Sequence, residues 1–265
     1  YHSYLFGETG SDNGFVCLDD DPGDKLADMF IGRLPVYTGS QLETVIDKII
    51  GYEEGGRDEW TRRVSFVADN KDAGIYRRMN DGLADMLSAD MQETKLYLAD
   101  NLSNLAACRS GIMDAFNEGS LMISYMGHGS VNKWAHEGLF GTGSVSALVN
   151  YEKLPFVMTM NCANGYFVYP AGVYNCLAEE LMYSTGGVIA IVAPGGISSV
   201  EIQNELSRGI FESVFKDGNP EIGPALMKGQ LRVMEKFGTG GENVINTFVL
   251  FGDPALRLKA SSIDD

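Results

Sequence analysis

Several features that would point to common protein classes are scarce or missing in this 265-residue chain. No apolar run approaches the roughly 18 residues that a membrane-spanning helix needs. Basic residues are outnumbered, 20 against 36 acidic ones, so the formal net charge is −16. Such a charge disfavours binding to nucleic acid and to anionic lipid. We therefore expect no membrane span and no nucleic-acid partner, whereas basic substrates or cations are compatible with the charge.

Cysteine and histidine are also rare, with four and three residues respectively. No CxxC pair occurs, and no spacing of these residues is typical of a zinc site. The four thiols could form two disulfides. However, Cys108 and Cys176 fall in segments with helical patterns, which favours buried free thiols. The cysteine pattern therefore does not decide whether the protein resides in an oxidising or a reducing compartment.

An acidic loop between residues 10 and 28 is the one segment that suggests a metal ion. Its six aspartates could supply the carboxylate oxygens that calcium prefers: Asp12, Asp19, Asp20, Asp21, Asp24 and Asp28. Their spacing fits no EF-hand loop, so a solvated loop is the favoured interpretation and a structural calcium ion is the alternative. No other feature of the sequence requires a cofactor.

From residue 61 onward, short apolar runs alternate with amphipathic stretches, and one amphipathic helix precedes this alternation. Strands are predicted at 64–69, 95–98, 120–126, 155–161, 188–193 and 247–250, and helices at 41–54, 74–89, 103–117, 143–150, 173–184, 200–217 and 223–237. Ser40 and Glu43 form a capping box for the first helix. The alternation predicts an α/β fold, with a mostly parallel sheet and helices on both faces. We expect a single domain over 1–265, with an irregular N-terminal segment and helix (1–60) and a core sheet (61–258).

Two of the apolar runs end in residues that carry reactive side chains. The first is followed by Gly127-His128-Gly129-Ser130 and the second by Asn161-Cys162-Ala163-Asn164-Gly165. Parallel strands share one carboxyl edge, where α/β proteins bind ligands, so His128 and Cys162 are expected to lie there together. A thiol beside an imidazole can perform nucleophilic acyl transfer, and backbone amides nearby can stabilise an oxyanion. Taken singly, a core cysteine and an ordinary loop histidine are the alternatives.

These features resemble the caspase-like cysteine peptidases of clan CD, and within that clan the gingipain family. The matching segments follow the family's order over nearly the whole chain: 31–35 (IGRLP), 47–53 (DKIIGYE), 125–130 (YMGHGS), 154–156 (LPF), 161–167 (NCANGYF) and 251–256 (FGDPAL). The resemblance implies a caspase-like fold and a secreted or cell-surface cysteine endopeptidase. It also implies a protein or peptide substrate and an inhibitory propeptide as partners. We expect the family's first subdomain, propeptide and C-terminal modules to be absent from these residues.

The resemblance further assigns roles to individual residues. Cys162 takes the place of the nucleophile and His128 that of the general acid–base, while the amides of Gly129 and Cys162 form the oxyanion hole. Asp69 takes the place of the acid that orients the histidine. Its position agrees, because Asp69 ends a strand that a caspase-like order puts beside the strand before His128. A strand-end cap is the alternative role for Asp69.

The substrate pocket departs from that of the gingipains that cleave after arginine. Their pocket has an aspartate at its base, in a longer loop after the first strand, and an aromatic lid. Here the loop is short, and Val200 takes the place of the lid. Asp72 and Glu201 are candidate replacements for the acid, so cleavage after basic residues is a hypothesis. Trp134 and Asn161 are further candidates for lining the pocket, with a core position as the alternative for Trp134.

Two other functions are compatible with the same residues. A sortase-like transpeptidase that processes secreted cargo would form the same thioester acyl-enzyme and resolve it with an amine instead of water. A catalytically silent binding module would need neither a thiol nor an imidazole at the sheet edge. The presence of both residues therefore argues against the binding module.

Overall fold

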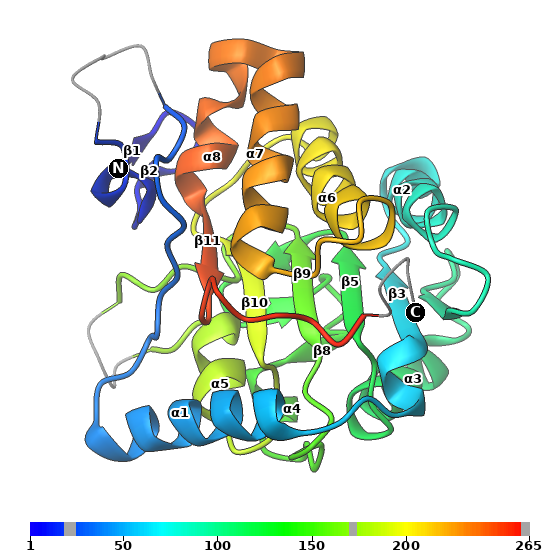
Figure 1. Ribbon diagram of the computed structural model, residues 1–265. Coiled ribbons are helices and arrows are strands. Elements are labelled where there is room, and N and C mark those ends of the chain that lie inside the picture. The colour runs from blue at the N-terminus through cyan, green and yellow to red at the C-terminus, as the bar shows by residue number, and fades with distance from the viewer. Residues whose placement is uncertain (19–24, 170–173, 261–265) are drawn as a thin grey trace.

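The computed structural model describes residues 1–18, 25–169 and 174–260, and a six-stranded sheet lies at its centre (Figure 1). The strands are β3 (Arg63–Ala68), β4 (Gln92–Tyr97), β5 (Met122–Met126), β9 (Phe156–Met160), β10 (Ala190–Pro194) and β11 (Phe248–Phe251). They are arranged in the order β11-β10-β9-β5-β3-β4. All neighbours are parallel except β10 and β11, which are antiparallel. The predicted mostly parallel α/β sheet is confirmed.

Helices cover both faces of this sheet (Figure 1). On one face lie α2 (Ile75–Ala84), α6 (Val200–Phe215), α7 (Ile222–Phe237) and α8 (Glu242–Thr247), and on the other lie α1 (Gly39–Glu54), α3 (Leu105–Asn117), α4 (Thr142–Val145) and α5 (Leu177–Tyr183). Two separate apolar clusters result, because successive residues of each strand point to opposite faces. No helix within the described ranges has the length and apolar character to cross a bilayer.

Short elements complete the described chain. They are strands β1 (His2–Ser3), β2 (Gly7–Glu8), β6 (Gly129–Ser130), β7 (Lys133–Trp134) and β8 (Phe140–Gly141), and 3-10 turns η1 (Asn13–Phe15), η2 (Glu59–Arg62), η3 (Asp72–Gly74) and η4 (Gly238–Gly241). Strands β6, β7 and β8 form a small antiparallel sheet directly after His128. The segment after the histidine is therefore built into regular structure.

The cap of α1 differs from the prediction. Thr38 is the N-cap, with extended backbone angles (φ −132°, ψ 156°), and its hydroxyl accepts a hydrogen bond from the Gln41 amide at 3.2 Å. The Gln41 side chain in turn accepts from the Thr38 amide at 3.2 Å. Ser40 lies inside the helix, where the backbone is already helical, so its side chain cannot serve as the N-cap. The predicted box of Ser40 and Glu43 is wrong by two residues.

The buried thiols agree with the prediction. Cys108 lies in α3 and is 4% exposed, and Cys176 is the N-cap residue of α5 with no exposed surface. Both are free thiols. They belong to the apolar cluster that α1, α3 and α5 form with the sheet, so their role is in packing.

The N-terminal segment joins the domain at the β11 edge of the sheet. The Arg33 amide donates to the Leu250 carbonyl at 2.8 Å, and the Gly252 amide donates to the Arg33 carbonyl at 3.0 Å. Gly32 is required there, because a Cβ atom at this position would lie 2.1 Å from the Gly252 oxygen. Two of the segments that carry the family resemblance, 31–35 and 251–256, therefore form one structural unit.

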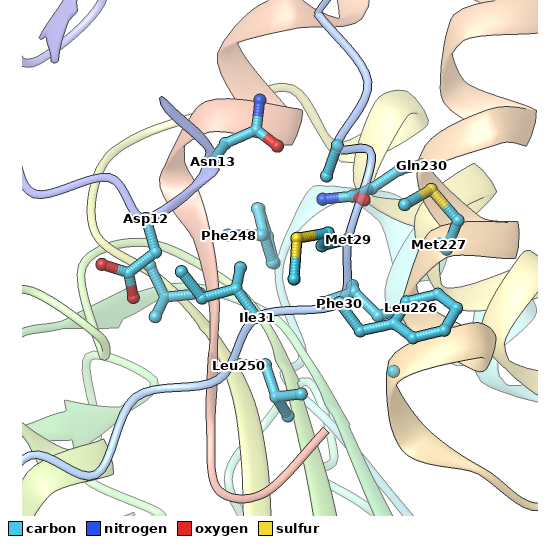
Figure 2. Close-up of a pocket in the computed structure, with 13 residues that line it drawn as sticks. Asp12, Asn13, Met29, Phe30, Ile31, Leu226, Met227, Gln230, Phe248 and Leu250 are labelled. Carbon is cyan, nitrogen blue, oxygen red and sulfur yellow. The ribbon is translucent and has the colours of Figure 1, made fainter. Parts of the chain in front are cut away.

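A small cavity of about 30 Å³ lies between this segment, α7 and β11. Figure 2 shows Met29 and Phe30 between β11, which carries Phe248 and Leu250, and α7, which carries Leu226 and Met227. None of the residues that line the cavity belongs to the predicted catalytic site. The cavity is thus a feature of how the N-terminal segment packs on the domain.

Candidate active site

The register of two neighbouring strands places His128 beside Cys162. Met126 of β5 lies opposite Met160 of β9, and His128 and Cys162 are each the second residue beyond that pair. The Gly127 amide donates to the Met160 carbonyl at 3.2 Å. A Cβ atom on Gly129 would lie 3.0 Å from the Cys162 carbonyl oxygen, so the two chain segments are in direct contact. The thiol, the imidazole and the Gly129 and Cys162 amides are gathered at the carboxyl edge of the sheet.

The turn that carries Cys162 is held in one conformation from several sides. Ala163 has a positive φ of 61°, which turns the chain sharply after Cys162. Its amide donates to the Gly196 carbonyl at 3.0 Å. The Gln203 side chain of α6 donates to the Asn161 carbonyl at 2.9 Å and to the Ser198 hydroxyl at 2.8 Å. Hydrogen bonds therefore connect the loop after β10 to the turn that carries Cys162.

Burial of Cys162 sets its acidity. Partial burial raises the pKa of the Cys162 thiol above its ordinary value, and a hydrogen bond from the Ser198 backbone amide acts in the opposite direction. Burial is the larger effect because it disfavours the charged thiolate. At neutral pH Cys162 is therefore mainly the thiol, and its attack on a carbonyl would require that the proton be taken up by a neighbouring base.

Alkylation kinetics provide a direct check of this acidity. Because only the thiolate reacts with iodoacetamide, we expect the alkylation rate at Cys162 to keep rising with pH beyond the ordinary cysteine value of ~8.5. Peptide mapping by mass spectrometry would assign the label, with Cys162→Ala giving the background from the other thiols. A rate that reached its plateau below about pH 7 would show an activated thiolate and contradict the buried-thiol description.

The main chain of His128 is fixed at both of its polar atoms. Its amide donates to Asp69 Oδ2 at 3.2 Å, and Asp69 Oδ1 accepts from the Asn70 amide at 2.6 Å. The Tyr125 hydroxyl donates to the His128 carbonyl oxygen. Asp69 and Tyr125 have no exposed surface. The imidazole therefore projects from a rigid backbone although its side chain is 53% exposed.

The acid that contacts the imidazole ring is Asp72. Its Oδ2 lies 3.2 Å from His128 Nε2, and the Tyr76 hydroxyl donates to the same oxygen at 2.6 Å. Asp69 was expected to orient the ring and Asp72 to line the substrate pocket. Asp69 instead holds the His128 amide, because its side chain is enclosed at the strand end, against Gly127. The two aspartates thus occupy positions different from those the sequence suggested.

Trp134 is a core residue, so the prediction that it lines a substrate pocket is wrong. It has no exposed surface and stacks on Tyr125, with ring centroids 4.5 Å apart and planes 8° from parallel. Phe140 packs on it with a centroid distance of 5.2 Å. The β-hairpin after His128 turns the indole inward, where it supports the tyrosine that holds the His128 carbonyl.

Asn161 makes its hydrogen bonds within the turn that carries Cys162. It is 1% exposed, and its amide donates to Asn164 Oδ1, while the Asn164 amide donates to the Ser130 carbonyl. This chain of hydrogen bonds ties the turn at Cys162 to the segment after His128. Asn161 is therefore too enclosed to present its side chain to a substrate in this conformation.

The remaining pocket candidates lie at the start of α6. Val200 is the first residue of that helix and packs partly against the core, and Glu201 is exposed in the first turn. They follow Ser198, whose amide contacts the Cys162 thiol. Their assignment to the substrate pocket stays a prediction.

Three residues of the site were not singled out as functional from sequence. Tyr76 contacts both Asp72 and the His128 ring. Gln203 holds the turn that carries Cys162, and Asn164 links that turn to Ser130. The sequence does place the amide side chain of Gln203 close to a predicted helix start and that of Asn164 close to a predicted strand end. Tyr76 carried no such signal, since an aromatic residue on a helix is ordinarily a packing residue.

The described part of the acidic N-terminal loop does not form a cation site. Asp12 forms a bidentate ion pair with Arg33, in which it accepts from Arg33 Nε at 3.0 Å. Asp28 accepts a hydrogen bond from the Leu18 amide at 2.6 Å. Within the described ranges no three acidic, histidine or cysteine side chains converge to hold a metal ion. The other four candidate aspartates, at 19, 20, 21 and 24, lie outside the described residues, so calcium binding stays a prediction.

Comparisons with known proteins agree with this geometry. Residues 1–259 match Peptidase family C25. The chain belongs to that family. The resemblance to the gingipain family and to clan CD is thereby confirmed.

Individual members of the family show the extent of the similarity. Gingipain R2 of Porphyromonas gingivalis strain W83 is 29% identical over 252 residues, which is 89% of this chain and 33% of the relative. The crystal structure of the Arg specific cysteine proteinase gingipain R superposes with a TM-score of 0.80 at 26% identity, covering 94% of this chain and 59% of that one. The complex of the RgpB pro- and mature domains superposes with a TM-score of 0.79 at 27% identity, covering 94% of this chain and 60% of that one. This chain thus spans about a third of the length of the first of these relatives.

Proposed function

We propose that this protein is a cysteine endopeptidase in which Cys162 is the nucleophile and His128 the general acid–base. The observation that carries the proposal is the register of β5 and β9, which sets both residues two positions beyond the paired Met126 and Met160. Membership of a peptidase family supports the reaction class. No described feature calls for a metal or another cofactor in this chemistry.

The reaction begins when Cys162 Sγ attacks the carbonyl carbon of the scissile peptide bond. His128 takes up the thiol proton and returns it to the departing amine nitrogen as the C–N bond breaks. The amides of Gly129 and Cys162, whose chain segments are in contact, are assigned to donate to the negative oxygen of the tetrahedral intermediate. The product is a thioester on Cys162, and water hydrolyses it to release the acid and regenerate the thiol.

The charge of the chain and the solved relatives bear on the choice of substrate. The net charge of −16 favours basic protein or peptide substrates by electrostatic attraction. One solved relative is described as Arg specific, which agrees with a preference for basic residues. Asp72 is engaged by His128 and Tyr76, so Glu201 is the better of the two candidate acids for binding a basic side chain. A structural calcium ion would stabilise the N-terminal loop and would take no part in the reaction.

The location and partners of the protein belong to the same proposal. We infer a secreted or cell-surface enzyme that acts on proteins or peptides and is kept latent by a propeptide. The solved complex of the RgpB pro- and mature domains supports the propeptide, since it shows such a pairing in a relative.

Product analysis tests the reaction. Peptides that vary the residue before the cleaved bond would be incubated with the protein, with and without a small primary amine, and the intact protein weighed by mass spectrometry. We expect a thioester adduct on Cys162 and free acid as the product, with arginine or lysine favoured. Amide product in preference to acid would establish the transpeptidase instead. Neither adduct nor product with any peptide would overturn the proposal and leave a binding module.

A further inference from the structure

A pocket of about 320 Å³ lies beside the candidate active site, in a part of the molecule that the proposed reaction does not use. Two short segments supply its lining. One begins two residues after His128, and the other follows the turn that carries Cys162. The lining residues are Ser130, Val131, Asn132, Tyr169 and Tyr174. The pocket is therefore within reach of a peptide that is bound at the two reactive side chains.

Hydrogen bonds hold the two segments together. The Asn164 side chain donates to the Ser130 carbonyl. The Ser130 hydroxyl donates to Asn132 Oδ1 at 3.1 Å, and the Asn132 side chain donates to the Tyr174 hydroxyl at 3.2 Å. The fold itself therefore shapes the pocket.

A row of aromatic rings leads into the pocket. The Tyr166 ring lies 5.4 Å from the Phe6 ring and 5.0 Å from the Tyr169 ring, measured between centroids. The Tyr169 ring in turn lies 5.6 Å from the Tyr174 ring. These separations fall in the range that aromatic pairs prefer. Because Tyr169 is 40% and Tyr174 is 47% exposed, the row ends in two rings on which a further ring can pack.

The lining favours an aromatic side chain over a charged one. Of the described residues that line the pocket, none carries a formal charge. A lysine, arginine or carboxylate side chain would therefore lose water there without gaining an ion-pair partner from these residues. The tyrosine rings and Val131 offer apolar surface, and Ser130 and Asn132 can form hydrogen bonds with the hydroxyl of a bound tyrosine.

The position of the pocket indicates which part of a substrate reaches it. Gly129, assigned to the oxyanion hole, directly precedes the first lining residue. His128 returns the proton to the departing amine, so the half of the substrate that carries this amine lies on the side of His128 and of the segment after it. Val131 packs on the apolar cluster of the α5 face, whereas Val200, at the start of α6, packs on the cluster of the opposite face. A peptide that crosses the two reactive side chains would therefore reach this pocket with the residues beyond the cleaved bond.

Resting on the proposed peptidase function, we propose that this pocket is a substrate subsite for an aromatic side chain at one of the first two residues beyond the cleaved bond. Tyr169 and Tyr174 determine its specificity by packing against the substrate ring, edge-on or offset. The aromatic residue departs with the amine, so the subsite acts on formation of the thioester and not on its hydrolysis by water.

Kinetics with matched peptides provide the first test. The peptides share the best residue before the cleaved bond and carry phenylalanine, alanine or lysine at the two positions beyond it. We expect kcat/KM to be about tenfold higher with phenylalanine than with alanine, the scale of one aromatic side chain packed on another. Tyr169→Ala and Tyr174→Ala should each lower this ratio to about threefold or less, whereas Tyr174→Phe keeps the ring and should retain the ratio. A lysine peptide hydrolysed as fast as the phenylalanine peptide, or no preference for phenylalanine, would overturn the proposal.

An exposed tyrosine at the other end of β9 is the matched control. Tyr151 is 56% exposed and precedes β9, whereas Cys162 follows that strand. Tyr151→Ala should leave both kcat and the ratio of phenylalanine to alanine peptides unchanged. A peptidyl coumarin has no amino-acid residue beyond the cleaved bond, so its hydrolysis reports general damage to the site. Losses of equal size on this substrate and on the phenylalanine peptide in Tyr169→Ala and Tyr174→Ala would refute the subsite.

An NMR titration tests binding without any turnover. In protein labelled at its tyrosine rings, the signals of Tyr169 and Tyr174 can be assigned by their loss in the two alanine variants. Phenylalanyl-alanine amide corresponds to the part of the substrate that departs, so it should shift both signals, and alanyl-alanine amide should shift them much less. Equal effects of the two compounds, or no shift at either ring, would contradict the subsite. The expected shifts in a protein that cleaves no peptide would support the subsite and overturn the peptidase assignment, so the two failures are distinguishable.

Discussion

Cys162→Ala is expected to lower peptide hydrolysis by at least about 10⁴-fold, the scale of loss seen when a catalytic nucleophile is removed. The reason is that no thioester can form without the sulfur atom, and the buried Cys108 and Cys176 lie in packing positions. Cys162 is only partly buried, so the small truncation should leave the unfolding temperature nearly unchanged. Hydrolysis of a fluorogenic peptide and a thermal melt would be measured on the same preparation.

A second cysteine substitution is the matched control for this result. Cys108→Ala removes a thiol from the core of α3, so it should lower stability modestly and leave the specific activity of the folded protein intact. Substantial turnover in Cys162→Ala would end the assignment of Cys162 as nucleophile. Loss of turnover in both variants to the same degree would attribute the effect to folding instead.

Lys48→Met is expected to give the largest loss of stability among the substitutions considered. The Lys48 ammonium is buried and donates to the carbonyls of Leu181, Met182, Ser184 and Gly186 at 2.8 to 3.3 Å. These oxygens lie at the end of α5, so a single side chain of α1 satisfies the helix terminus and attaches one helix to the other. Methionine fills the same volume but donates nothing, which leaves several buried acceptors without partners.

Urea denaturation would measure the effect of Lys48→Met. A loss of about 3 to 5 kcal/mol in the free energy of unfolding is expected, since each orphaned buried group costs on the order of 1 to 3 kcal/mol and the four acceptors are not independent. Lys259→Met is the control, because the Lys259 ammonium donates to one carbonyl, that of Gly56, at 3.1 Å and is partly exposed. Equal stability of Lys48→Met and the wild type would refute the capping role.

The pH dependence of stability gives a second signature of Lys48. Burial lowers the pKa of Lys48 to about 7 in the folded protein, whereas an unfolded lysine has a value of ~10.4. Between these values the unfolded chain binds more protons, so the contribution of Lys48 to stability increases as pH rises through this window. The difference in unfolding free energy between the wild type and Lys48→Met should therefore grow from about pH 7 toward pH 10. A constant difference would mean that Lys48 does not titrate in this range.

The sequence by itself determined the fold class and the pair of reactive residues. Strands and helices follow from apolar spacing within each segment, and His128 and Cys162 directly follow two such strands. Parallel strands end at the same edge of a sheet, so local patterns were sufficient to predict that His128 and Cys162 lie at one edge. The structure shows them two residues beyond the paired methionines of β5 and β9.

Tertiary structure decided which acid contacts the imidazole and that Trp134 is buried. The spacing of Asp69 and Asp72 in the sequence gives no indication that a left-handed turn carries Asp72 back to the ring while Asp69 is enclosed beside Gly127. Trp134 likewise enters the core because the hairpin after His128 folds onto Tyr125. Side-chain direction in turns depends on contacts between distant segments, and those contacts leave no periodic signal in the chain.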